Sequence, residues 1–297
     1  MNDEMAIETH ELTRRYGDTL AVSHLNLRVP RRQVTAFLGR NGAGKSTTIK
    51  MLLGITSITS GGGSVLGRAI QDPAQNCQLR RDVAYVAEDK RLYSYMTVEQ
   101  IIRFTRSLYQ DWQPAAEARL LKQFRLPPRQ KIKSLSKGMR TKLALLLAFS
   151  RRPELLILDE PSEGLDPVSI EELLQEIVGA VANGVTVFFS SHQIAEVERI
   201  ADRVCILDQG ALLVDACLDD IRREYRRITL SFYAPPPKVN PSLPGIKQVR
   251  ISGRQMTLLA TENANAVAEL ALDLHPASIE VTPVGLREVF LETVREN

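Results

Sequence analysis

The chain has 297 residues, of which 44% are hydrophobic and 25% are charged, and its formal net charge is +3. This composition is typical of a soluble globular protein, and the length suffices for one large domain and a small one. The charge is too small to indicate a nucleic-acid partner, and none is expected.

The cysteines and the lengths of the apolar runs indicate where in the cell the protein is expected. Cys77, Cys205 and Cys217 lie far apart without metal-binding spacing, which suits a reducing cytoplasm. Residues 1–4 are acidic and lack a signal-peptide pattern, and apolar runs such as residues 143–149 are far too short to cross a bilayer. Any membrane role is therefore expected to come through a separate partner chain.

The first predicted elements are short strands within residues 6–35. Apolar residues recur at every second position at Leu25, Leu27 and Val29, and this alternation predicts antiparallel strands. Further on, the three glycines of residues 61–63 predict a loop.

Residues 39–47 match the phosphate-binding loop pattern G-x-x-x-x-G-K-[ST]. The apolar run of residues 34–38 predicts the strand that enters this loop. Ile49, Leu52 and Leu53 recur at helical spacing, which predicts the helix that leaves it. Strand, loop and helix therefore agree with the motif.

The chemistry of a triphosphate explains these residue types. Successive backbone N–H groups and a helix N-terminus bind its negative charge, and they approach it closely only where side chains are absent. Lys45 would bind the β- and γ-phosphates, and the Ser46 hydroxyl would ligate Mg²⁺. The chain is predicted to bind a nucleoside triphosphate, with further contacts from Gly39, Asn41, Gly42, Ala43, Gly44 and Thr47.

Tyr16 precedes Gly17 in a predicted turn between two early strands. A tyrosine in such a turn is by default half-buried packing. With the phosphate loop nearby, stacking on an adenine is the alternative interpretation, and the sequence leaves both open.

Residues 83–86 predict another buried strand, and Glu88 follows it in a polar loop. The same loop carries large apolar and aromatic side chains at Leu92, Tyr93, Tyr95 and Met96. They either pack on the helix predicted to begin after Thr97, or form a docking surface for a partner. Residues 97–150 are predicted to be mostly helical, with breaks at Pro114, Pro127 and Pro128.

Within that region, Ser136 and Gly138 precede another predicted helix, where they need be no more than a cap. Residues 155–158 are apolar and predict a strand buried on both faces, which ends in Asp159 and Glu160. Ligands bind at this edge of an α/β sheet. Asp159 would hold Mg²⁺, and Glu160 would polarise an attacking water.

Residues 185–189 predict one more strand, which leads to His192. This histidine is either a hydrogen-bonded structural residue or a contact to a γ-phosphate. Residues 204–214 predict a hairpin that closes the domain. A small α/β unit follows, with a hairpin around Ser252 and Gly253 and helices over residues 264–274 and 286–294.

Together, the phosphate loop, residues 135–139, the Asp159–Glu160 pair and His192 resemble the nucleotide-binding subunit of an ATP-binding cassette (ABC) transporter. The resemblance covers about residues 5–215. It implies an α/β fold, a P-loop NTPase core sheet with an antiparallel β subdomain and a helical subdomain at about residues 97–150. The nucleotide-binding domain would span residues 1–222 and a small C-terminal α/β domain residues 223–297.

The resemblance also implies how the subunit works. It implies an ATPase with ATP and Mg²⁺ bound between two subunits, in a homodimer or a heterodimer. Lys45 and Ser46 of one subunit would face Ser136 and Gly138 of the other. Asp166 matches the segment that links the two sites. Glu160 would be the general base, His192 the γ-phosphate contact and Tyr16 the adenine-stacking aromatic.

Two departures from the family pattern stand out. The signature usually contains Leu-Ser-Gly-Gly-Gln, whereas this chain has Lys137 and Met139 at the third and fifth positions. Glu88 stands where the family usually has a glutamine that touches Mg²⁺ and the attacking water. A carboxylate still ligates Mg²⁺, but its negative charge beside the phosphates bears on hydrolysis and on coupling to the partner.

The family resemblance finally implies a partner and a location. A transmembrane permease would dock near residues 88–96, at the cytoplasmic face of the cell membrane. The C-terminal tail, which includes Leu286 and Phe290, is similar to the accessory domain of drug and antibiotic exporters. The alternative function is a soluble or regulatory ABC-type ATPase that is not coupled to transport.

Overall fold

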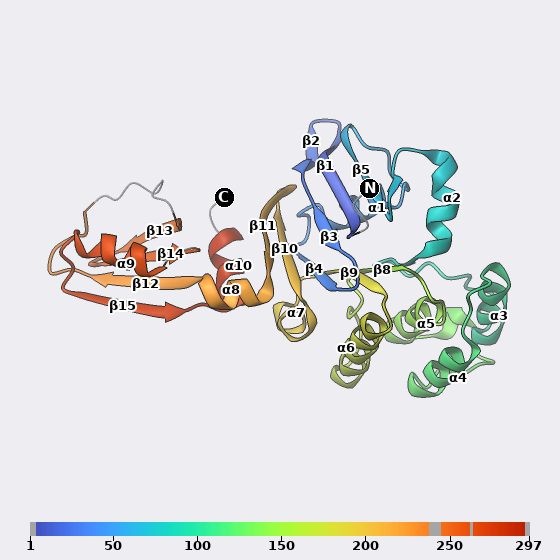
Figure 1. Ribbon diagram of the computed structural model, residues 1–297. Helices are drawn as coiled ribbons and strands as arrows, with labels where there is room; N and C mark the ends of the chain where they lie inside the picture. Colours follow the sequence, from blue (N-terminus) through green and yellow to red (C-terminus); the bar gives the residue numbers. More distant parts are fainter. Residues whose placement is uncertain (1–3, 238–244, 262–263, 295–297) are drawn as a thin grey trace. The chain divides into compact units, whose positions relative to one another are not determined.

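The computed structural model describes residues 4–237, 245–261 and 264–294 (Figure 1). Contacts within the chain divide it into two compact units, residues 1–215 and residues 216–297. In the part of the chain that is described, no helix combines the length and the apolar character needed to span a membrane.

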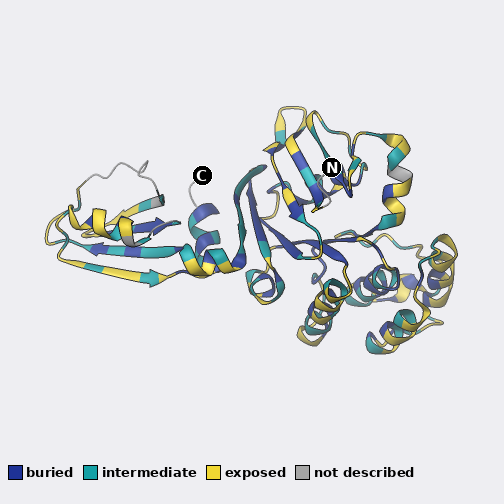
Figure 2. Cartoon of the chain, viewed as in Figure 1, coloured by how far each residue is buried: buried dark blue, intermediate teal, exposed yellow. Residues whose placement is uncertain are grey.

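The first unit is built on a central sheet with the strand order β11-β10-β4-β9-β8-β7. Its strands are β4 (Val34–Leu38), β7 (Val83–Val86), β8 (Leu155–Asp159), β9 (Thr186–Ser191), β10 (Arg203–Asp208) and β11 (Ala211–Cys217). The strands from β10 to β7 pair in parallel. Every residue of β4, β8 and β9 is buried (Figure 2), as expected for parallel strands covered on both faces.

The register of this sheet brings three strand ends together. Leu38 pairs with Ser191, and Asp159 pairs with Ser190. The residues that follow β4, β8 and β9 therefore leave the sheet at one edge. Helices α1 (Lys45–Leu52), α2 (Pro73–Asp82), α6 (Pro167–Ala182) and α7 (Ile194–Ile200) pack against its strands.

An antiparallel sheet covers part of the same unit. It consists of β1 (Met5–Tyr16), β2 (Thr19–Leu25), β3 (Arg28–Pro30), β5 (Ser60–Val65) and β6 (Arg68–Ala69). Its buried side chains share one hydrophobic core with α1 and the central sheet, and that core includes Leu27, Ile49 and Phe188. The antiparallel strands predicted from alternation are thus confirmed.

The loop predicted for residues 61–63 was wrong, because these glycines lie within β5. Their backbone runs very close to β1. A Cβ on Gly63 would lie 2.5 Å from the Glu8 carbonyl oxygen, and Gly61 has a φ of +77° beside Glu11. Here glycine permits close strand pairing rather than a loop.

A helical region forms the remaining part of the first unit. It contains α3 (Val98–Leu108), α4 (Pro114–Gln123), the 3₁₀ turn η1 (Ile132–Ser134) and α5 (Lys137–Phe149). Thr97 caps α3 in a capping box with Gln100, and Pro114 begins α4, where its missing N–H costs no helical hydrogen bond. The predicted helical region and its cap at Thr97 are confirmed.

The second unit contains α8 (Leu218–Glu224), β12 (Arg226–Ser231), β13 (Ile246–Ser252), β14 (Gln255–Ala260), α9 (Ala264–Leu272), β15 (Ser278–Pro283) and α10 (Leu286–Val294). Its antiparallel sheet has the order β13-β14-β12-β15. Ile228, Leu230 and Met256 of the sheet pack with Val267 and Ala271 of α9. The predicted small α/β unit is therefore present.

Phe188→Ala is expected to destabilise the first unit by about 3–5 kcal/mol, because it removes a fully buried ring from the core. The Phe188 ring centroid lies 5.3 Å from that of Phe37. Chemical denaturation followed by circular dichroism measures the loss. Val168→Ala is the control, since that side chain is 69% exposed. Equal denaturation midpoints for the two variants would contradict the described core.

Candidate functional site

The phosphate loop connects β4 to α1 and depends on glycine. Gly42 and Gly44 have φ angles of +84° and +107°, which side chains rarely tolerate. A Cβ on Gly39 would lie 2.5 Å from the Leu207 carbonyl oxygen, and one on Gly44 would clash with the carbonyl oxygen of Ala21. Side chains other than hydrogen would therefore deform the loop.

The loop borders a cavity of about 260 Å³. Glu88 and Glu160 line this cavity together with the loop, although they are far from it in the sequence. The complete lining is Ala21, Arg40, Asn41, Gly42, Ala43, Gly44, Lys45, Ser46, Thr47, Glu88 and Glu160. The cavity thus joins backbone N–H groups and a cation with two carboxylates.

Lys45 and Glu160 form a buried ion pair in this cavity. Each residue is only 6% exposed, and Lys45 Nζ lies 3.2 Å from Glu160 Oε1. Lys45 Nζ also donates a hydrogen bond to the Gly39 carbonyl oxygen at 2.8 Å. Among the described residues, Glu160 Oε1 accepts no hydrogen bond of good geometry, so charge attraction dominates its contact with Lys45.

Asp159 and Ser190 fix the turn that carries Glu160. Ser190 Oγ donates to Asp159 Oδ1 at 2.6 Å and accepts a hydrogen bond from the Glu160 backbone N–H at 3.0 Å. Glu160 has a φ of +47°, in the left-handed region. The two hydrogen bonds hold this unfavourable backbone conformation in place.

His192 contacts the second carboxylate oxygen of Glu160. Its Nδ1 lies 2.8 Å from Glu160 Oε2 and donates a proton, because a carboxylate oxygen is the acceptor. Its Nε2 lies 3.1 Å from the side-chain nitrogen of Gln193. Glu160 therefore has Lys45 on one oxygen and His192 on the other.

Ser136 and Gly138 lie outside the cavity lining. Ser136 is exposed and caps α5, since its Oγ accepts a hydrogen bond from the Met139 N–H at 3.2 Å. A Cβ on Gly138 would lie 2.6 Å from the Gly164 carbonyl oxygen. The signature segment, residues 135–139, therefore packs on the loop before α6.

Asp166 and Tyr16 also lie outside the lining. Asp166 caps α6 by accepting hydrogen bonds from Ser169 N at 3.0 Å and Ser169 Oγ at 2.6 Å, and these bonds lower the pKa of Asp166. Tyr16 is 46% exposed, and the Arg14 guanidinium carbon lies 4.3 Å from its ring centroid. The ring is thus partly covered by a cation.

Two charged residues near Glu160 were missed by sequence reasoning. Lys90 Nζ donates a hydrogen bond to the Glu160 carbonyl oxygen at 3.4 Å, and burial lowers the pKa of Lys90. Glu196 on α7 is 9% exposed, and burial raises its pKa while a hydrogen bond with Ser162 lowers it. The sequence feature that could have drawn attention to Glu196 is its place next to an apolar residue, Val197, in a short helix.

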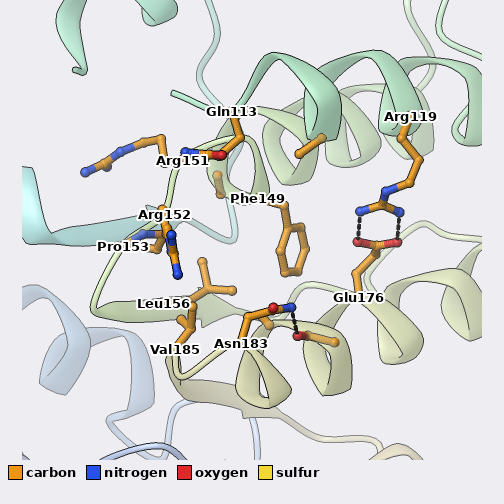
Figure 3. A pocket seen from close by; sticks show the side chains of 14 residues that line it. Gln113, Arg119, Phe149, Arg151, Arg152, Pro153, Leu156, Glu176, Asn183 and Val185 are labelled. Atoms are coloured by element: carbon orange, nitrogen blue, oxygen red, sulfur yellow. Dashed lines mark hydrogen bonds and ion pairs between the residues drawn. The ribbon is translucent and has the colours of Figure 1, made fainter. Parts of the chain in front are cut away.

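A larger cavity of about 390 Å³ lies away from this chemistry, between α4, α5 and α6 (Figure 3). Phe149 and Leu156 form part of its apolar lining. At its side, Arg119 of α4 binds Glu176 of α6 through two hydrogen bonds of 2.5 and 2.7 Å. No phosphate-loop residue lines this cavity, so volume alone does not locate the functional site.

Comparison with known proteins identifies the family. The model of the family described as ABC transporter matches residues 22–163. The uncharacterized ABC transporter ATP-binding protein YhaQ of Bacillus subtilis is 35% identical over 228 residues, which cover 75% of each chain. This chain belongs to the ABC transporter family.

Two further comparisons agree with this ABC assignment. The bacitracin transport ATP-binding protein BcrA of Bacillus licheniformis is 34% identical over 224 residues, which cover 74% of this chain and 72% of BcrA. A solved ATP-binding subunit of an ABC transporter superposes with a TM-score of 0.67 at 34% identity, over 73% of this chain and 92% of that one. The ABC chain is an ATP-binding subunit and an ATPase, and its predicted P-loop fold is confirmed.

The stability of this ABC subunit is expected to respond to pH through Glu196. Its folded-state pKa lies above the ordinary value of 4.5, so the folded state binds the proton more tightly than the unfolded state does. The stability contributed by this proton is present below that value and is lost as the pH rises through the folded pKa. Replacing Glu196 by Gln removes this loss.

The expected result is that Glu196→Gln gains stability relative to the parent protein between about pH 5 and about pH 8. Denaturant titrations at both pH values measure the difference. Glu99→Gln, an exposed change on α3, is the control and is expected to give the same difference at both. A difference for Glu196→Gln that does not vary with pH would show that burial does not raise its pKa.

Proposed function

We propose that this subunit binds ATP with Mg²⁺ in the phosphate-loop cavity and hydrolyses it between two paired subunits. Hydrolysis would drive a separate transmembrane permease of an exporter. The observation that carries the proposal is the cavity itself, in which Lys45 at the start of α1 meets Glu160, the residue after β8.

The residues of this site fit both a triphosphate and Mg²⁺. Gly42 lines the cavity, and a Cβ there would meet no other atom within 4 Å, so its missing side chain leaves space for phosphate oxygens beside the backbone N–H groups of the loop. The hydroxyl of Ser46 and the carboxylates of Asp159 and Glu88 are oxygen ligands, which Mg²⁺ prefers. When bound, Mg²⁺ would neutralise charge on the phosphates.

Glu160 is suited to act as the general base. A triphosphate would compete with its carboxylate for Lys45 Nζ, because both are anions and the buried ammonium lies 3.2 Å from Glu160 Oε1. Oε1 would then be free to accept a proton from a water molecule. His192 would hold the other oxygen and so keep the carboxylate oriented.

The position of the signature segment supports a contribution from a second subunit. Ser136 is exposed and lies outside the lining of its own chain's cavity, so it would reach a γ-phosphate from a neighbouring subunit. Gly138 would allow the same approach, and Asp166 would lie at the contact between the subunits. Tyr16 would stack on the adenine. The Arg14 guanidinium would then either leave the Tyr16 ring or remain on the ring face that the adenine does not cover.

The permease would dock on the segment of residues 88–96. Tyr93 is 50% exposed and Tyr95 is 68% exposed, and their ring centroids lie 5.9 Å apart. Leu92 of this segment, with Tyr85 and Ile55, lines a cavity of about 340 Å³ with an apolar wall. Exposed aromatic side chains beside an apolar groove are typical of a protein interface.

The proposed permease implies a location for the subunit and a class of transported molecule. Docking on a permease would place the subunit at the cytoplasmic face of the cell membrane. The similarity to a bacitracin transport protein supports an exporter of drug-like or antibiotic molecules. The second unit, residues 216–297, would then be an accessory domain.

Glu160→Gln is expected to lower ATP turnover by at least about 100-fold, because an amide does not accept the proton from water. ATP binding is expected to persist, and size-exclusion chromatography with ATP should show a more stable dimer. Lys45→Ala is the contrasting variant, since it should lose nucleotide affinity in calorimetry. Undiminished turnover by a strictly monomeric Glu160→Gln protein would refute the proposed role.

Replacing Tyr93 and Tyr95 together by Ser is expected to reduce co-purification with a hydrophobic membrane chain from detergent-solubilised membranes. The reason is the loss of two aromatic contacts, each worth about 1–2 kcal/mol at an interface. Tyr233→Ser is the control, because Tyr233 is 87% exposed in the second unit. ATP turnover without the permease should not change. Equal recovery of the membrane chain would place the docking surface elsewhere.

A further inference from the structure

Lys90 connects the segment of residues 88–96 to the backbone of Glu160. It is half-buried, and its ammonium donates to the Glu160 carbonyl oxygen at 3.4 Å. The same carbonyl oxygen accepts a hydrogen bond from the Glu163 N–H at 3.3 Å. Lys90 is therefore one of the contacts that hold Glu160 in its left-handed conformation, with a φ of +47°.

Lys90 also lies among carboxylates. Its charge interacts most strongly with that of Glu163 and more weakly with those of Asp159 and Glu88, and the like charge of Lys137 opposes them. Glu163 in turn pairs with Lys137 of the signature segment, with 2.5 Å between Lys137 Nζ and Glu163 Oε1. Glu88 and Lys137 thus belong to one group of neighbouring charges around Lys90.

Charge balance gives Lys90 a second role beside its hydrogen bond. Glu88 brings a second carboxylate to the cavity that Glu160 also lines. Like charges at short range repel, and an opposite charge nearby offsets that repulsion. Lys90 supplies this positive charge two residues away, from the same loop as Glu88.

We infer that Lys90 is a positioning residue, which balances the extra carboxylate of Glu88 and holds the Glu160 backbone through its hydrogen bond to the carbonyl. This inference rests on the proposed role of Glu160. It also gives the segment of residues 88–96 a direct mechanical contact with the general base. A shift of this segment would move the Lys90 ammonium and release the Glu160 carbonyl oxygen.

Hydrogen exchange on the nucleotide-free protein tests the contact without relying on ATPase activity. In Lys90→Met, amides of residues 160–165 are expected to exchange about fivefold faster, because one charge-assisted hydrogen bond is lost. Lys90→Arg keeps the cation and should exchange at nearly the original rate. Lys131→Met, a matched change of an exposed lysine, is the control. Unchanged exchange in Lys90→Met would overturn the positioning role.

Steady-state ATPase kinetics test the charge balance. Lys90→Met is expected to lower kcat about tenfold with little change in KM, because the base is misplaced rather than the nucleotide released. In a Glu88→Gln background the same change should cost at least about threefold less, since the charge to be balanced is gone. An equal loss in both backgrounds would overturn the charge balance.

The two readouts separate this inference from the proposed function. If the parent protein had no ATPase activity, the proposed function would fail. Faster exchange in Lys90→Met would still support the contact with Glu160, and unchanged exchange would still remove it. Retained thermal unfolding midpoints in each variant verify that the proteins compared are folded.

Discussion

The buried ion pair between Lys45 and Glu160 is the interaction on which the site depends. Its partners follow different strands, β4 and β8, and β9 lies between these strands in the sheet. Only the parallel register brings their ends to one edge. Burying two charges carries a large desolvation cost, and mutual attraction offsets it when the geometry is good. The pair is therefore better explained by function than by stability. Its cation is suited to bind phosphate, and its carboxylate is suited to accept a proton.

The sheet around this pair explains its precision. All residues of β4, β8 and β9 are buried, so a shift by one residue in any of them would move close-packed side chains out of their positions. Ser190 adds a local constraint, since it binds both the Asp159 carboxylate and the Glu160 N–H. The buried sheet and the Ser190 hydroxyl thus hold Asp159 and Glu160 in fixed positions at the sheet edge where the phosphate loop begins.

Much of this arrangement was predictable from the sequence because it depends on local patterns. The phosphate loop has a fixed spacing of glycines and lysine, and the apolar runs before Lys45 and Asp159 predict covered parallel strands. The three glycines of β5 were mistaken for a loop, because the close approach of β1 that requires them is a tertiary feature. Lys90 and Glu196 were missed for a related reason. A side chain that binds a distant carbonyl or hydroxyl group produces no periodic pattern.

The close contact between Gly138 and Gly164 restricts how this subunit can rearrange. A Cβ on Gly138 would lie 2.6 Å from the Gly164 carbonyl oxygen, so the start of α5 and the loop before α6 pack at a distance that a larger side chain would not allow. The ion pair of Lys137 with Glu163 fastens the same junction. Ser136 is two residues before Gly138 and Asp166 is two residues after Gly164, so this junction connects the two positions within one subunit.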